Sequence, residues 1–208
     1  MMQIITFIAI LSLMLTGCLP AVFTAATGTA LVAAKDQPMT ESINDTKIAT
    51  SINTSFIKNN FKQLYTKIKI EVNAGRVLMT GSVDNHDDIL KAVEIVWSIE
   101  GVKEVINELT VDKNSARFDL VQYTKDTMIT SQIKTKTFLD RGIKCVNYTI
   151  VTINDVVYIF GTARSLEELE KVTSIASQVG GVARVVSHAR IREITQDENK
   201  HITDEDDA

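Results

Sequence analysis

The chain carries one sequence pattern twice, and this duplication constrains its fold more than any other feature. The matching pairs of segments are 76–82 with 156–162, 99–105 with 179–185, and 46–52 with 127–133. The first two pairs are separated by 80 residues and the third by 81. A fixed internal period means that one structural unit is built twice. We therefore expect two domains of the same fold, domain 1 at 46–112 and domain 2 at 126–192.

The first half of each copy predicts a helix followed by a β-hairpin. The helix is expected to begin after Asp45 in domain 1 and after Asp126 in domain 2, because Asp is a favoured N-cap and apolar residues follow at helical spacing. Strands with alternating apolar residues come next. Turns at 73–75 and 154–155 join each of them to a second strand.

The second half of each copy predicts a helix and a last strand. Gly81 and Gly161 are expected to end the second hairpin strand, and the helix that follows carries one apolar stripe. Gly101 and Gly181 are expected to stop that helix in a left-handed conformation. The fold class is therefore α+β, with two tandem αββαβ domains, each with two helices packed on one face of a three-stranded sheet.

This pattern resembles the BON domain family. The resemblance rests on the αββαβ order, on hairpin strands with a late glycine, and on Gly-Val-x-x-Val at 101–105 and 181–185. It implies two BON domains, at 46–112 and 126–192, in a periplasmic protein without enzymatic activity. It also implies binding of anionic phospholipid through the second BON domain and a role in envelope integrity.

The N-terminus resembles the lipobox of bacterial lipoproteins. An apolar run at 4–15 is too short to span a bilayer, and Leu-Thr-Gly precedes Cys18. The resemblance implies a signal peptide at 1–17 and a diacylglycerol and an acyl chain, such as palmitate, on Cys18. Leu19 in place of Asp favours the outer membrane. The alternatives are an uncleaved hydrophobic tail, or a plain secretory leader with an incidental cysteine.

The segments outside the two domains are expected to be linkers and a tail. They are a lipidated N-terminus and linker at 18–45, a linker at 113–125, and an acidic tail at 193–208. Residues 196–208 have six acidic residues and one lysine, so we expect the tail to be disordered. A lipobox before two BON domains resembles the dual BON-domain lipoproteins. We therefore expect a lipid-anchored protein on the periplasmic face of the outer membrane.

The two copies differ in charge. Residues 46–112 have eight Lys and Arg against nine Asp and Glu, whereas residues 125–192 have ten against six. An anionic membrane surface attracts each nearby Lys or Arg by about 1 kcal/mol. Domain 2 is therefore the copy expected to contact anionic phospholipid.

The first helix of domain 2 is the expected lipid-binding surface. Met128 lies about 100° from the core stripe of that helix, and Leu139 is a second apolar candidate. The basic candidates are Lys125, Lys134, Lys136 and Arg141. In the BON resemblance, Met128 aligns with an aromatic position of this helix. The alternative is an ordinary solvated helix in which Met128 fills a gap between the domains.

Three aromatic residues are candidates for an interdomain or partner surface. Tyr158 and Phe160 belong to a strand that is apolar on both faces, so the outer face is expected to pack on domain 1 or to bind a partner. Trp97 is replaced by Ser177 in the second copy, which favours the same kind of surface. A core tryptophan at the helix end is the alternative.

The sequence offers no catalytic constellation, no metal site and no cofactor beyond the lipid on Cys18. The three histidines, His86, His188 and His201, are isolated in sequence. Basic residues are not clustered with stacking aromatics, so no nucleic acid is expected as a partner. The leading partner is an anionic phospholipid membrane. The alternative is a protein-interaction module that docks on envelope assembly or division proteins.

Overall fold

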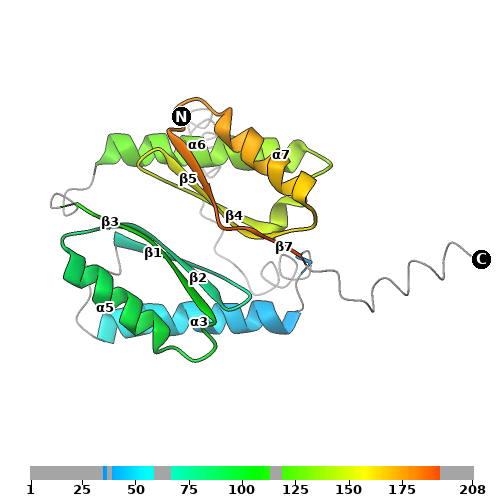
Figure 1. The fold of residues 1–208 in the computed structure, drawn as a ribbon. Coiled ribbons are helices and arrows are strands. Elements are labelled where there is room, and N and C mark those ends of the chain that lie inside the picture. The colour runs from blue at the N-terminus through cyan, green and yellow to red at the C-terminus, as the bar shows by residue number, and fades with distance from the viewer. Residues whose placement is uncertain (1–34, 37–38, 59–66, 113–118, 193–208) are drawn as a thin grey trace, which may run out of the picture. The chain divides into compact units, whose positions relative to one another are not determined.

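The structure is a computed structural model, and residues 35–192 fold into two domains of the same topology (Figure 1). The described residues are 35–36, 39–58, 67–112 and 119–192. The expected signal peptide at 1–17, the lipid-bearing Cys18 and the acidic tail at 193–208 lie outside the described residues. Both domains belong to the same compact unit, which begins at Lys35.

Domain 1 has two helices on one face of a three-stranded sheet (Figure 1). Its elements are α3 (Met39–Lys58), β1 (Ile68–Asn73), β2 (Arg76–Val83), α5 (His86–Trp97) and β3 (Glu104–Val111). The strand β2 is central, antiparallel to β1 and parallel to β3. The helix α5 makes the crossover that a parallel pair of strands requires.

Domain 2 repeats this arrangement. Its elements are α6 (Leu120–Leu139), the 3₁₀ turn η1 (Cys145–Asn147), β4 (Tyr148–Ile153), β5 (Val156–Ala163), α7 (Leu166–Ser177), β6 (Arg184–Ser187) and β7 (Arg190–Ile191). The central strand β5 is antiparallel to β4 and parallel to β6 and β7. The tandem αββαβ prediction is confirmed.

Each domain has its own apolar core between its helices and its sheet. In domain 1, Phe56 of α3 and Val96 of α5 are fully buried against Val77 and Met79 of β2. The corresponding core of domain 2 includes Ile133, Val157, Ile159, Val172 and Ala176. In the central strands, alternate residues face these cores, as the period of a β-strand dictates.

The first helix of each domain begins earlier than the sequence predicted. The helix α6 begins at Leu120, and its N-cap is Asp119, whose carboxylate accepts hydrogen bonds from the backbone N–H groups of Val121 (2.9 Å) and Gln122 (3.0 Å). Asp126 lies inside the helix and is buried. The predicted N-caps at Asp45 and Asp126 are therefore wrong, and both helices extend into the expected linkers.

Asp45 and Asp126 instead hold the hairpin turns of their domains. Asp126 accepts hydrogen bonds from the backbone N–H groups of Asn154 (2.8 Å) and Asp155 (2.9 Å). Asp45 makes the equivalent pair, both at 2.8 Å, with the turn between β1 and β2. Asn154 and Asp155 have positive φ, as a tight hairpin turn requires. An Asp before an apolar helical run looks like an N-cap in sequence, although its carboxylate serves a turn 28 residues later.

Gly81 and Gly161 do not end their strands, which continue for two more residues. Their φ angles are +129° and +134°, and a Cβ would lie 2.0 Å from the carbonyl oxygen of Lys67 and 2.1 Å from that of Asn147. Only glycine permits this approach of the backbone at the start of the neighbouring strand.

Candidate functional site

The helix α6 is amphipathic, but its outward face lacks the charged residues that usually cover the exposed side of a helix. Ile129, Ile133 and Thr137 are buried against the sheet. At 100° per residue, the opposite face carries positions 120, 124, 128, 131, 135 and 138. None of these residues is charged.

Apolar side chains occupy both ends and the middle of that outward face. Met128 is 57% exposed and Phe138 73% exposed, and Leu120, Val121 and Leu139 are exposed as well. Hydroxyl-bearing residues lie between them, namely Thr124, Thr127, Ser131 and Thr135. We call the five apolar residues, Leu120, Val121, Met128, Phe138 and Leu139, the α6 apolar face. Exposed apolar groups that share one face mark a surface for a partner or a membrane.

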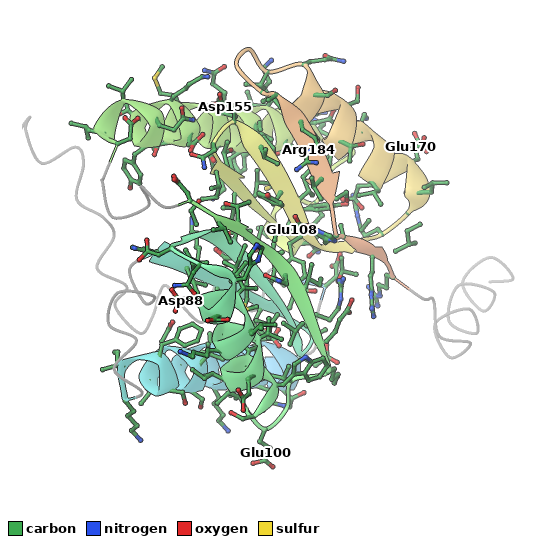
Figure 2. The ribbon with its side chains drawn as sticks, turned by 60° about the vertical axis from the view of Figure 1, so that its left-hand side comes forward. Asp88, Glu100, Glu108, Asp155, Glu170 and Arg184 are labelled. Carbon is green, nitrogen blue, oxygen red and sulfur yellow. The ribbon has the colours of Figure 1, made fainter. Side chains whose placement is uncertain are left out.

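The predicted basic residues differ in their surroundings. The ammonium group of Lys125 lies 2.6 Å from a carboxylate oxygen of Asp155 at the hairpin tip, which is labelled in Figure 2. This hydrogen bond, followed by that from Gln122, lowers the pKa of Asp155. Lys136 and Arg141 are exposed.

Lys134 is exposed but also lies within reach of a carboxylate of domain 1. Burial raises the pKa of Glu71 on β1, and the positive charges of Lys69 and Lys134 oppose that rise. The positive charge of Lys134 therefore also acts on the carboxyl group of Glu71. Lys136 is the lysine of the pair that is better placed to meet an external anion.

A shallow groove of about 520 Å³ runs along the first half of α6. Its walls include Leu120, Val121, Met128 and Lys125 on the helix and Gly180 in the loop after α7. Most of this lining is apolar, with one ammonium group at its edge. Such a groove can take a short apolar group next to an anionic one.

Domain 1 has a groove at the equivalent place, but its lining is charged. It measures about 610 Å³, and it is lined by Glu41, Lys47 and Glu100 among others. Lys47 occupies the place of Met128, and Lys58 that of Leu139, at the shift of 81 residues. The apolar side chains at these two positions are therefore particular to domain 2, whereas Phe138 has an exposed apolar counterpart in Ile57 of α3.

The structure brings most of the predicted lipid-binding residues onto one helix. Met128 and Leu139 are eleven residues apart, which places them on the same side of α6. Arg141 lies beyond the C-cap residue Asp140 and is not part of the helix. Sequence reasoning missed three apolar residues of this face, Leu120, Val121 and Phe138. The first two had been assigned to a linker, whereas Phe138 lies at the correct helical angle and could have been found.

Tyr158 and Phe160 lie on the face of β5 that is turned away from the helices of domain 2. Both are buried in a small cluster with Leu78 of β2. Ile106 and Val186 pack against this cluster from the last strands of the two domains. The central strand of each domain thus contributes to its own core on one face and to a shared cluster on the other.

Polar contacts join the same two sheets around the cluster. His188 lies 2.7 Å from a carboxylate oxygen of Glu108, and Arg190 lies 2.5 Å from one of Glu104. The guanidinium group of Arg76 lies over the ring of Phe160, 5.2 Å from its centre. Arg76 also donates to Glu104 at 2.7 Å. These contacts give the two domains a defined interface.

Trp97 is not part of this cluster. It lies at the end of α5, is 53% exposed, and belongs to no apolar core of the described residues. The two locations that sequence reasoning offered inside the molecule, the domain interface and the core of domain 1, therefore do not apply to it. The remaining candidate role for Trp97 is in a surface that binds a partner.

Within the described ranges, no three His, Cys, Asp or Glu side chains are grouped so that they could hold a metal ion. None of the helices among those residues is both long enough and apolar enough to cross a bilayer.

Tandem αββαβ domains with a parallel β2–β3 pair and a glycine inside the central strand define a class of small duplicated α+β domains. The family model described as the BON domain matches residues 44–113 and 125–193. The chain therefore belongs to the BON domain family.

Curated relatives agree with this assignment. An uncharacterized protein of Anaplasma centrale, encoded in the gshII 5' region, is 39% identical over 72% of this chain and 96% of its own length. The outer membrane lipoprotein DolP of Haemophilus influenzae is 31% identical over 84% of this chain and 89% of its own length. The osmotically-inducible protein Y of Escherichia coli is 27% identical over 69% of this chain and 70% of its own length.

Proposed function

We propose that this protein is a non-enzymatic, lipid-anchored protein of the periplasmic face of the outer membrane. It binds anionic phospholipid through α6 of domain 2 and thereby supports envelope integrity. The observation that carries the proposal is the α6 apolar face, in which Met128 and Leu139 occupy positions that are lysines, Lys47 and Lys58, in domain 1.

The chemistry of the α6 apolar face suits the headgroup boundary of a bilayer. Its apolar side chains can insert shallowly while hydroxyl groups and flanking lysines stay in the headgroup layer. Phe138 supplies an aromatic side chain, which the predicted site at Met128 does not. The groove beside Met128 is edged by Lys125, whose ammonium group a lipid phosphate would share with the carboxylate of Asp155.

The anchor and the location are supported by the N-terminal sequence and by one relative. The segment that ends in Leu-Thr-Gly-Cys18 has the lipobox pattern, and DolP of H. influenzae is named an outer membrane lipoprotein. An anchor with two or more acyl chains holds a protein at a membrane stably, whereas one chain does so only marginally. Mass spectrometry of the mature protein tests this part, because an unacylated Cys18 would contradict it.

Vesicle co-sedimentation tests the lipid-binding surface. A soluble version spanning residues 35–208 contains both cores and should bind phosphatidylglycerol vesicles, but not phosphatidylcholine vesicles. Binding should weaken as salt is raised, because the attraction between exposed charges is screened. Met128→Glu and the double change Lys134→Glu/Lys136→Glu should each lower the affinity at least tenfold.

Lys47→Glu in α3 is the matched control, because Lys47 is the domain 1 counterpart of Met128. It reverses a charge at the same place in the fold and should leave vesicle binding nearly unchanged. Undiminished binding by the α6 variants, with circular dichroism spectra like the parent, would remove α6 as the site. No vesicle binding at all by the parent would favour the alternative, a module that docks on envelope assembly or division proteins.

A further inference from the structure

The second helices of the two domains, α5 and α7, share their length, their N-cap and their main core contacts. Each has twelve residues, begins after an N-cap side chain that accepts a hydrogen bond from the backbone N–H group three residues later, and buries two apolar residues at matching places, while α7 also buries Glu168. The N-caps are Asn85 and Ser165. Differences between α5 and α7 on the outer face are therefore not dictated by packing.

The outer faces of α5 and α7 differ in polarity at three matching positions. The pairs, at a shift of 80 residues, are Leu90 with Glu170, Val93 with Thr173, and Trp97 with Ser177. In domain 2 these three positions are polar, and Glu170 points away from α7 (Figure 2), although Leu166 is exposed at the start of the same face. In domain 1 the three positions are apolar. We call Leu90, Val93 and Trp97, at spacings of three and four residues, the α5 apolar stripe.

Leu90 and Trp97 of the α5 apolar stripe are exposed, whereas Val93 between them is half-buried. Leu90 is 67% exposed, and neither Leu90 nor Trp97 belongs to the domain 1 core, which Val93 only borders. An exposed tryptophan beside an exposed leucine on one helix face has the composition of a protein-binding surface, in which Trp often contributes most of the binding energy.

The charges around the α5 apolar stripe select the kind of partner. The exposed residues next to it include Asp87 and Glu94 on α5 and Glu100 in the following loop. The helix α5 itself has three acidic residues and one lysine. An anionic bilayer would be repelled by this rim, whereas an apolar helix with flanking lysines would be attracted.

Among the described helices, α6 of domain 2 fits this description better than α3, whose exposed Ile43 and Ile57 are separated by Lys47. The α6 apolar face is flanked by Lys125, Lys134 and Lys136, and it is uncharged along its centre. We propose that the α5 apolar stripe of one molecule docks on the α6 apolar face of a second copy of this chain. The apolar stripes pack together, and the acidic rim of α5 meets the lysines of α6.

This contact is heterologous, because two different surfaces meet. The pair as a whole keeps one α5 and one α6 free, so the contact can repeat and build short open chains. A helix of twelve residues is about 18 Å long, and a contact between two such helices is smaller than the 1,200 Å² or more of stable complexes. The association is therefore weak in solution and becomes significant at high local concentration.

The proposed self-association is a second activity beside lipid binding, and both would use the α6 apolar face. Since α6 cannot contact a bilayer and a second copy at once, self-association and binding to anionic vesicles compete. Association is measured without lipid, so failure of the lipid proposal leaves this test intact, and the reverse also holds.

Sedimentation velocity across a concentration series of residues 35–208 tests the contact. The parent should shift from monomer toward larger species as its concentration rises to the millimolar range, and less so at high salt. Trp97→Glu should weaken association at least tenfold. Ser177→Glu, the matched change on α7, should leave association unchanged.

A mixing experiment separates this contact from every symmetric one. Trp97→Glu has a defective α5 and an intact α6, whereas Met128→Glu combined with Phe138→Glu has the opposite defect. Each variant alone should remain monomeric, and an equimolar mixture should form a one-to-one heterodimer. A parent that is monomeric at all concentrations, or a mixture that stays monomeric while the parent associates, would overturn the proposal. So would association that survives in the α6 variant alone, because α5 would then pair with itself.

Discussion

Replacing Asp126 with alanine should destabilise domain 2 far more than replacing Asp119, although the sequence marks Asp126 as the N-cap. The Asp126 carboxylate is buried and accepts hydrogen bonds from the backbone N–H groups of Asn154 and Asp155. Asp126→Ala removes the protein acceptor of both donors, and an unsatisfied buried donor costs about 1–3 kcal/mol, less where water reaches it as at the exposed Asn154. We expect a loss of about 3 kcal/mol in total. Asp119→Ala removes an exposed cap and should cost about 1 kcal/mol.

Urea unfolding can measure this difference domain by domain. Trp97 is the one tryptophan of the chain, so its fluorescence reports on domain 1, while far-ultraviolet circular dichroism reports on both domains. Asp126→Ala should move part of the circular dichroism transition to lower urea. Asp45→Ala, the same change in the other copy, should move the fluorescence transition by a similar free energy. If Asp119→Ala costs as much as Asp126→Ala, the assignment of Asp126 to the turn is wrong.

Three further outcomes follow from the interface and the strands. Leu78→Ala and Phe160→Ala should each destabilise the pair of domains by about 3 kcal/mol, and a double-mutant cycle should show coupling above about 0.5 kcal/mol; strict additivity would contradict their contact. The hydrogen bond from Arg76, with the nearby charge of Arg190, lowers the pKa of Glu104. The ionised Glu104 therefore stabilises the folded protein fully above the unfolded-state pKa, and this stabilisation is lost as the pH falls through the folded-state pKa. The stability difference between the parent and Glu104→Gln should therefore shrink below about pH 4.5, and a difference that grows there would contradict the assignment. Gly161→Ala should cost about 3 kcal/mol or more in thermal unfolding, whereas a neutral effect would mean that the strand backbones are further apart.

The fold could be predicted from the sequence because its main signals are local and appear twice. Apolar spacing in the helices, alternation in β1 and β4, and glycines at the loop positions Gly101 and Gly181 all agree between the copies. Both of these glycines have positive φ, as predicted. Agreement of two independent copies removes the ambiguity that a single short pattern would leave.

The errors came from side chains whose partners are distant in sequence. Asp126 serves a turn 28 residues later, and Gly161 accommodates a carbonyl group of residue 147, so neither role is visible in a local window. The α6 apolar face was found only in part, because the early N-terminus of the helix hid Leu120 and Val121. Trp97 was singled out because its counterpart is Ser177, but sequence could not say whether it was buried.

Because β5 is covered on both faces, domain 2 is incomplete on its own. Cutting the chain between the domains would bare Tyr158 and Phe160 to water as an apolar patch on a three-stranded sheet. Such a fragment would stick to liposomes and to itself through a surface that the intact molecule never presents. Binding assays on single domains would therefore report non-specific adhesion as specific binding. The two-domain unit is the smallest one in which specific binding can be measured.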